Sequence, residues 1–237
     1  MNEFIINDPD GNMLHFGEIS PDVSPQPPTF LFKPKRTTLL RLAALLSITT
    51  ATYSQSPPKS WDYSLTVDGF IVPDDVSFVS PTFTADHNWL HLEARYNYEN
   101  LRTGSLWIGY NFSAGKNLTL NLTPMVGGIF GRTAGVAPGG EFSLAYKKIE
   151  LSFSNEYVFA FSRRSDSFYY AWPQLTYSPF EWLKVGGAAQ STKAYQTKLD
   201  VQRGFLVGVA RKNTSFTTYV FNPGISPTVV LEARIEF

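Results

Sequence analysis

Two copies of one short motif place acidic and basic side chains close together along the chain. The tetrapeptide Leu-Glu-Ala-Arg occurs at residues 92–95 and again at residues 231–234. In an extended strand, residues two apart lie on the same face, so Glu93 lies beside Arg95 and Glu232 beside Arg234. Such a charged row can line a path for permeating solutes, or it can neutralise itself through ion pairs in a narrow interior. Both interpretations stay open at this point.

The charged residues lie in segments where apolar and polar residues alternate, which is the pattern of a β-strand with one apolar face. In WLHLEARYNY (89–98) the apolar and aromatic residues occupy every second position. Similar segments recur from Trp61 to the end of the chain, at intervals of roughly ten to fifteen residues. Their polar faces supply the candidates for an interior lining, namely His91, Glu93, Arg95, Glu141, Glu150, Gln174, Lys184, Glu232 and Arg234.

Composition excludes several classes of protein. The chain has 237 residues, enough for one large β domain, and its formal net charge is zero, so no global field attracts nucleic acid. It contains no Cys, which rules out disulfides and thiolate metal sites. No apolar run is long enough for a transmembrane helix, but transmembrane β-barrels dilute their apolar residues by alternation.

Residues 33–55 have the layout of a secretory signal peptide. Lys33, Lys35 and Arg36 form a basic region, and a short apolar stretch and small residues follow, with cleavage expected after Ala51 or Ser54. The preceding residues are rich in Pro and Asp without a clear period, and we expect no fold there. The predicted organisation is therefore a late-starting leader and signal peptide over 1–54 and a β-barrel over 55–237. Either the true start codon lies downstream of Met1, or the leader is unusually long.

Connections between the alternating segments differ in length in a regular way. Tight links at 113–117, 147–148, 178–181 and 211–213 alternate with longer ones such as RRSDS and TKAYQTKLD. This alternation is typical of an antiparallel up-and-down transmembrane β-barrel, with short turns on one side of the membrane and longer loops on the other. Aromatic residues near the segment ends, among them Tyr96, Tyr98 and Tyr110, match the interfacial girdles of such barrels.

The expected number of strands is twelve, with ten as the alternative. Ten segments follow residue 88, and the segments 62–72 and 76–85 add two more. With ten strands the two Leu-Glu-Ala-Arg copies would be antiparallel neighbours, and Glu93 would face Arg234. With twelve strands the first hairpin separates them. Four prolines (Pro81, Pro124, Pro138 and Pro173) lie inside predicted strands, so we expect bulges or shifted boundaries there.

The last ten residues, TVVLEARIEF, resemble the C-terminal β-signal of Gram-negative outer-membrane β-barrel proteins. Val229, Leu231, Ile235 and Phe237 match the apolar positions of that signal, and Phe237 is the terminal aromatic. The resemblance implies recognition by the barrel-assembly machinery and export through the secretory pathway to the outer membrane. It also implies contact with outer-membrane lipid and lipopolysaccharide, and we expect a monomer.

Three functions are compatible with this pattern. The first is a narrow, porin-like channel or transporter for small solutes, and the second is a non-conducting structural or adhesive membrane protein that acts through its loops. The third is a soluble secreted β-barrel that binds a ligand, because alternation alone does not fix which face is buried.

We do not predict an enzyme. Outer-membrane lipases and acyltransferases pair Ser with His at the extracellular rim, whereas the two histidines after the leader, His87 and His91, lie at the opposite end. These histidines and Asp86 make a weak metal cluster, so no metal and no cofactor are expected.

Overall fold

The computed structural model describes residues 6–7, 13–14, 60–73, 75–194, 197–224 and 226–237. The chain divides into two units, Met1–Pro58 and Lys59–Phe237. In the first unit, β1 (Ile6–Asn7) and β2 (Met13–Leu14) pair antiparallel, a pairing that the aperiodic sequence did not predict. The predicted signal peptide lies outside the described residues. Within the described part of the chain, no helix is long and apolar enough to cross a bilayer.

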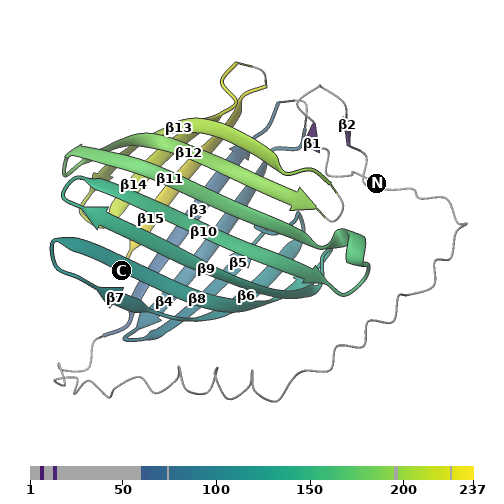
Figure 1. The fold of residues 1–237 in the computed structure, drawn as a ribbon, viewed down its shortest axis with the longest axis horizontal. Helices are drawn as coiled ribbons and strands as arrows, with labels where there is room; N and C mark the ends of the chain where they lie inside the picture. The colour runs from purple at the N-terminus through teal and green to yellow at the C-terminus, as the bar shows by residue number, and fades with distance from the viewer. Residues whose placement is uncertain (1–5, 8–12, 15–59, 74, 195–196, 225) are drawn as a thin grey trace, which may run out of the picture. The chain divides into compact units, whose positions relative to one another are not determined.

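The second unit consists almost entirely of β-strands joined by hairpins (Figure 1). The single exception among its described elements is the short 3₁₀ helix η1 (Arg164–Asp166). The strands are β3 (Asp62–Ile71), β4 (Phe78–His87), β5 (Leu90–Tyr96), β6 (Thr103–Tyr110), β7 (Phe112–Ala114), β8 (Leu118–Gly131), β9 (Gly135–Tyr146), β10 (Ile149–Ala160), β11 (Phe168–Phe180), β12 (Leu183–Ala194), β13 (Asp200–Arg211), β14 (Thr214–Phe221) and β15 (Thr228–Glu236).

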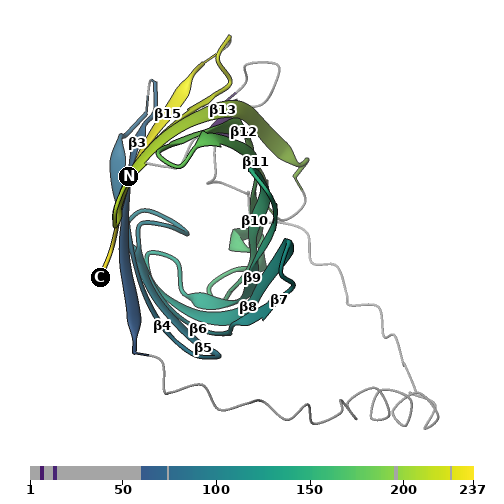
Figure 2. The same ribbon diagram turned by 90° about the vertical axis from the view of Figure 1, so that its left-hand side faces the viewer.

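These strands form a closed antiparallel barrel. β6 and β7 both pair with β8 and are interrupted at Asn111, so they are two parts of one strand. Counted this way, the described residues contain twelve barrel strands, which confirms the expected number. β15 pairs with β3 and closes the ring, as the view along the barrel in Figure 2 shows. β3 and β4 therefore separate the two Leu-Glu-Ala-Arg segments, as a barrel of twelve strands requires.

The two ends of the barrel carry different connections. The end that holds Asp62 and Phe237, here called the short-turn end, has links at 88–89, 115–117, 147–148, 181–182 and 212–213. Three of these turns begin with a left-handed residue, Asn88, Lys147 or Lys212, as two-residue hairpin turns require. The other end, here called the long-loop end, has connections at 72–77, 97–102, 132–134, 161–167, 195–199 and 222–227. The connection at 132–134 is shorter than predicted because β8 continues to Gly131.

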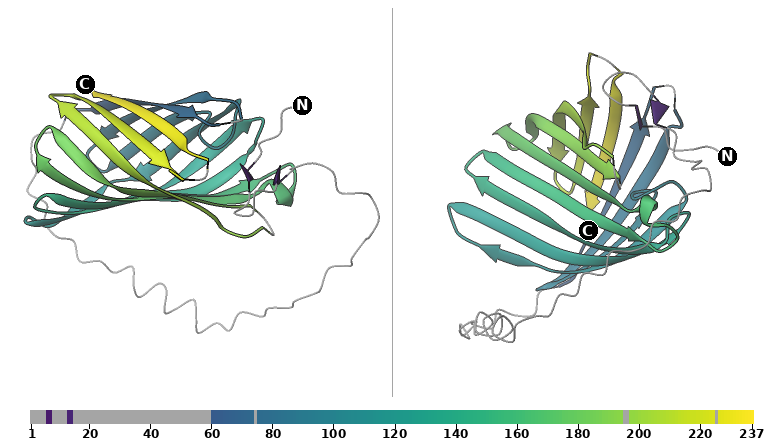
Figure 3. Two further views of the ribbon diagram at one scale, coloured as in Figure 1. Left: turned by 90° about the horizontal axis from the view of Figure 1, so that it is seen from above. Right: turned by 45° about the vertical axis from the view of Figure 1, so that its right-hand side comes forward.

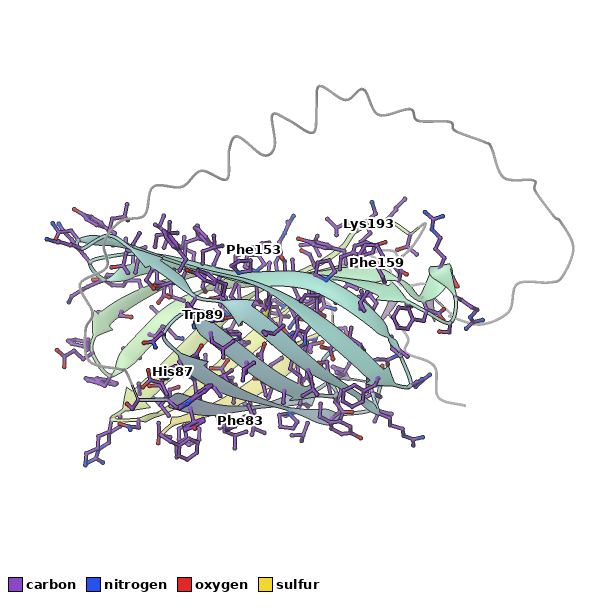
Figure 4. The ribbon with its side chains drawn as sticks, turned by 90° about the horizontal axis from the view of Figure 1, so that it is seen from below. Phe83, His87, Trp89, Phe153, Phe159 and Lys193 are labelled. Atoms are coloured by element: carbon purple, nitrogen blue, oxygen red, sulfur yellow. The ribbon has the colours of Figure 1, made fainter. Side chains whose placement is uncertain are left out.

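Apolar side chains cover the outer face of the barrel. Leu106, Ile108, Phe130 and Leu175 each expose about half of their surface or more. Phe83 and Phe159 lie on the outer surface in Figure 4, and the tilt of the strands that carry them is visible in Figure 3. A face of this composition matches hydrocarbon and not water, because a soluble barrel would bury its apolar residues.

Aromatic rings gather on the outer face at the short-turn end. Trp61 stacks with Tyr63 at 6.2 Å, Trp89 with Tyr110 at 5.7 Å, and Phe180 with Trp182 at 5.7 Å between ring centroids. All six of these side chains are exposed. Tyr and Trp rings combine an apolar body with a polar group, and such rings are enriched at the boundary between lipid and water.

The four strand prolines cause no shift of register, contrary to the expectation of bulges or shifted boundaries, but pairing is missing on one side of three of them. The ladder between β9 and β10 skips Pro138, the ladder between β11 and β12 skips Pro173, and the break between β6 and β7 lies opposite Pro124, because proline has no N–H to donate. The residue pairing on either side of Pro81, Pro124, Pro138 and Pro173 keeps the same register. The register places all four side chains on the outer face. The one irregularity recorded in the described ladders lies between Tyr177 and Phe180.

Candidate functional site in the barrel lumen

The inner face of the barrel carries all nine side chains that the sequence pattern selected. In an antiparallel ladder, directly paired residues point to the same side, so the register can be followed around the barrel. On this path His91, Glu93 and Arg95 of β5 share a face with Trp107, Met125 and Val158, which are buried. The same path places Glu141, Glu150, Gln174, Lys184, Glu232 and Arg234 on the inner face.

Arg95 is the centre of a buried charge cluster. Its Nη2 lies 2.7 Å from Glu93 Oε2, its Nη1 lies 2.9 Å from Glu156 Oε2, and Glu99 Oε1 lies 4.0 Å from Nη1. The guanidinium also lies over the rings of Tyr98 and Trp107, at 4.3 and 4.5 Å from their centroids. Arg95 therefore pairs with three carboxylates near it.

A chain of alternating charges leads from this cluster toward the short-turn end. His91 Nδ1 lies 2.8 Å from Asp86 Oδ1, and His91 Nε2 lies 3.8 Å from Glu93 Oε2. Asn111 Nδ2 donates to the same Asp86 oxygen at 2.6 Å. The order of groups along the wall is thus Asp86, His91, Glu93, Arg95 and Glu156. Ion pairing within the interior, one of the two interpretations of the motif, describes the first copy of Leu-Glu-Ala-Arg.

The connection 97–102 between β5 and β6 folds into the barrel. Ser105 Oγ and Trp107 Nε1 donate to Glu99 Oε1 at 2.5 and 3.3 Å, and the Glu99 side chain is fully buried. Tyr98 meets the ring of Tyr170 edge-on, with 5.9 Å between centroids. The prediction that Tyr98 belongs to the outer aromatic face is therefore wrong. β5 ends at Tyr96, and the left-handed backbone of Asn97, at a φ of 59°, breaks the alternation there.

Two glycines, Gly127 and Gly139, lie next to the ring of Trp107. A Cβ added at Gly127 would come within 2.4 Å of Trp107 Cδ2, and one at Gly139 within 3.2 Å of Trp107 Cζ3. Glycine at these two positions leaves the space that the indole ring fills. Trp107 in turn supports the guanidinium of Arg95.

A second buried cluster fills the opposite side of the lumen. It consists of Trp172, Ala188, Leu206, Tyr219, Phe221 and Val230, with Phe70 and Tyr170 packed against it. The Trp172 ring meets those of Tyr219 and Phe221 edge-on, at 5.2 and 5.5 Å between centroids. Tyr219 and Phe221 come from β14, the strand whose inner face the sequence did not identify. Together with the Arg95 cluster, these side chains occupy part of the barrel interior.

Two cavities lie toward the short-turn end of the barrel. The larger has a volume of about 560 Å³, and its lining includes Asp68, Glu93, Arg95, Tyr98 and Glu141. The smaller, of about 320 Å³, is lined in part by Trp182, Lys184 and Glu236, and Arg234 borders both. The larger cavity therefore runs from the short-turn end to the Arg95 cluster.

The predicted lining residues do not form one constellation. Glu141 borders the larger cavity, and Lys184 borders the smaller one. Glu150 is exposed and Gln174 is half-buried. Glu232 Oε2 accepts a hydrogen bond from the Tyr219 hydroxyl at 3.0 Å. Glu93 and Arg95 of the first motif thus belong to one buried ion cluster, whereas Glu232 of the second motif bonds to Tyr219 and Arg234 pairs with Glu236.

Sequence reasoning missed four residues of the site: Asp68, Tyr98, Glu99 and Glu156. Asp68 and Glu156 lie on polar faces of predicted strands and could have been included on that ground. Tyr98 was assigned to the outer face, and the inward course of the 97–102 connection that brings Glu99 into the lumen has no periodic signal.

The described residues include no group of three or more His, Asp or Glu side chains suited to hold a metal ion. His87 stacks on Trp61, with 5.0 Å between centroids.

Comparisons with known proteins agree with this architecture. No family model and no curated protein matches the chain. Among solved structures, the KdgM porin is similar with a TM-score of 0.53 and 12% identity, over 73% of this chain and 99% of that one. The KdgM porin in complex with disordered oligogalacturonate gives the same values. The outer membrane protein Omp33 of Acinetobacter baumannii has a TM-score of 0.44 and 10% identity, over 75% and 98% of the two chains.

The fold is that of porin-like outer-membrane β-barrels. This conclusion follows from the closed antiparallel barrel of the described residues and from its similarity to the KdgM porin.

Proposed function

We propose that this protein is a narrow channel for small solutes in the outer membrane of a Gram-negative bacterium. One observation carries the proposal. A polar cavity of about 560 Å³ enters the lumen from the short-turn end and stops where Tyr98, a residue of a connecting loop, covers Arg95. If the interior only had to be filled for stability, side chains of the strands would suffice, and no loop residue would have to cover Arg95.

The loop is suited to act as a gate. Glu99 and Tyr98 reach the lumen from outside the strand ladder, so their withdrawal would break no backbone pairing of β5 or β6. Their recorded contacts are side-chain contacts to Arg95, Ser105, Trp107 and Tyr170. Loop movements of this kind are the usual way in which barrels and enzymes admit solutes without unfolding their scaffold.

The charge of the larger cavity bears on the type of solute. Its lining contains five carboxylates, Asp62, Asp68, Asp86, Glu93 and Glu141, against two guanidinium groups and one imidazole. The KdgM porin has been solved with an oligogalacturonate, which is a polyanion. Acidic walls repel polyanions, so we do not propose such a cargo for this chain.

Orientation and assembly complete the proposal. We infer that the long-loop end faces outward and that the chain is exported as a monomer through the secretory pathway. Val229, Leu231, Ile235 and Phe237 all lie on the outer, lipid-facing side of β15. There they are accessible to barrel-assembly machinery, membrane lipid and lipopolysaccharide.

Planar bilayers test the channel. A heat-dependent gel shift first establishes that the purified protein is folded. The protein is then reconstituted in about 1 M KCl, where the Debye length is about 3 Å. We expect discrete, small conductance steps. Correctly folded protein that produces no steps, even with the Tyr98 and Glu99 side chains removed, would overturn the proposal.

A non-conducting membrane protein is the second candidate, and one observation favours it. Leu206, Tyr219, Phe221 and Val230 are almost completely buried inside the barrel, so half of the lumen resembles a protein core. The variant without the loop side chains separates the two candidates, because removing them leaves this core intact.

A further inference from the structure

Two carboxylates face each other at the seam where the barrel closes. Asp68 of β3 and Glu232 of β15 are directly paired in the ladder, so both side chains point into the lumen. Directly opposed residues have Cβ atoms about 4.5–5.5 Å apart, and like charges at this separation repel. A sequence selected only for stability would not place two acidic residues there.

Asp68 is buried and has an unpaired oxygen. Its relative exposure is 8%, it borders the larger cavity, and its Oδ1 has no hydrogen-bond partner among the described residues. Ser80, its ladder partner on β4, also has an unpaired buried hydroxyl. A buried carboxylate without a partner costs free energy unless something else satisfies it.

The two arginines that border the larger cavity have other partners. Arg234, two residues from Glu232, lies with its Nε 3.2 Å from Glu236 Oε1. Arg95 is held by Glu93 and Glu156. Within the described residues, the recorded ion pairs thus leave Asp68 and Glu232 without a cation.

Aromatic side chains border the acidic pair on the side away from the cavity. Phe70 lies two residues along β3 on the same face as Asp68 and packs against the cluster of Trp172, Tyr219 and Phe221. Tyr219 connects the two groups directly, because its hydroxyl donates to Glu232 at 3.0 Å. Carboxylates beside aromatic rings are the combination that binds an ammonium group attached to a hydrocarbon.

We propose that Asp68 and Glu232 form a binding site for small organic ammonium cations, reached through the larger cavity. The ammonium would bind to Asp68 at the cavity wall, beside Glu232, and its hydrocarbon part would lie in the cavity, whose lining includes the ring of Tyr98. A divalent metal is less suited, because the site offers two carboxylates and no third acidic or imidazole ligand within the described residues. The inference rests on the proposed channel, of which it names the substrate class.

Equilibrium binding tests the site without any need for conduction. Protein folded in detergent at pH 7 and low salt is titrated with n-butylammonium chloride in a calorimeter, with n-butanol as the neutral probe. We expect saturable binding of the cation, at least a tenfold weaker binding by Asp68→Asn and Glu232→Gln, and no saturable binding of butanol. The matched control is Glu150→Gln, an exposed acidic residue of the inner face, which should bind as the wild type does.

Each outcome decides something. Equal binding by wild type and Asp68→Asn, or no saturable binding at all, overturns the site. A heat-dependent gel shift for every variant establishes that the barrel has folded. Binding without conductance, both in the wild type and in the variant without the Tyr98 and Glu99 side chains, would leave the site intact and reject the channel. Conductance steps without binding would do the reverse.

Discussion

Arg95 and Glu156 form an ion pair that spans the interior, with 2.9 Å between Nη1 and Oε2. Their strands, β5 and β10, are not neighbours in the sheet, since β6, β8 and β9 lie between them. The pair therefore links two parts of the wall that no backbone ladder connects. Both side chains are almost fully buried, at 4% and 3% exposure, so the loss of one partner should be costly.

Replacing Arg95 with Met should destabilise the barrel by about 3–5 kcal/mol, because Glu93, Glu99 and Glu156 would remain buried without their cation. The measurement is urea unfolding of the protein in lipid vesicles, followed by tryptophan fluorescence. Arg163→Met is the control, since Arg163 is 75% exposed and pairs with Asp166 only at the surface. Similar unfolding midpoints for the two variants would contradict the central role of Arg95.

Gly127→Ala should destabilise the barrel by about 1–3 kcal/mol, because the new methyl group would overlap the Trp107 ring. Gly128→Ala is a closely matched control. A Cβ at Gly128 meets nothing within 4 Å, so we expect a change within about 0.5 kcal/mol. Unfolding in urea measures both, and a shift in the tryptophan emission maximum of Gly127→Ala alone would identify Trp107 as the displaced group. Equal stability of the two variants would reject the proposed packing.

The double variant Tyr98→Ala with Glu99→Ala should raise the conductance or the fraction of time spent open. It removes both loop side chains that enter the lumen while the ladder of β5 and β6 stays paired. Single-channel recording compares it with Asn100→Ala, which removes the hydrogen bonds of the Asn100 side chain with Thr133 Oγ1 and Leu101 N but leaves Tyr98 and Glu99 in place. A double variant that conducts as the wild type does would exclude the connection 97–102 as the gate.

Deletion of Phe237 should lower the amount of protein in the outer membrane much more than it lowers the stability of barrels that do assemble. The side chain is 66% exposed and contributes little packing, although its backbone N donates to Tyr63 O at 2.9 Å. Surface levels are measured by quantitative labelling of intact cells. Phe161→Ala, with a side chain 70% exposed, is the control for the loss of an outer aromatic ring. Normal surface levels after the deletion would remove the support for an assembly signal.

The barrel itself could be predicted from the sequence because alternation is a local property of each strand. The positions of Leu106, Ile108 and Leu175 follow from period two, and the strand number follows from counting such segments. The effect of the strand prolines on the register was predicted wrongly, because it is not a local property of the strand that contains them. Whether Pro81 or Pro173 interrupts a ladder depends on the strand beside it, and that information lies elsewhere in the chain.

The interior was less predictable, because its contacts join distant strands. Nothing near Arg95 in the sequence indicates that its partner is Glu156, and the two Leu-Glu-Ala-Arg segments would have been neighbours only in a barrel of ten strands. Tyr219 and Phe221 were not assigned to the lumen, because a large ring suits either face of a barrel strand. Only the closed register shows that these rings face Trp172.

The place of Asp68 and Glu232 has a consequence for the way in which the barrel is observed. One residue lies on the first barrel strand and the other on the last, so the pair exists only in molecules whose two outermost strands have joined. The amount of a bound cation that needs both carboxylates would therefore measure the fraction of molecules whose barrel has closed. Its occupancy would distinguish them from sheets that have all their hairpins but remain unsealed, a difference that measurements of strand content would not detect.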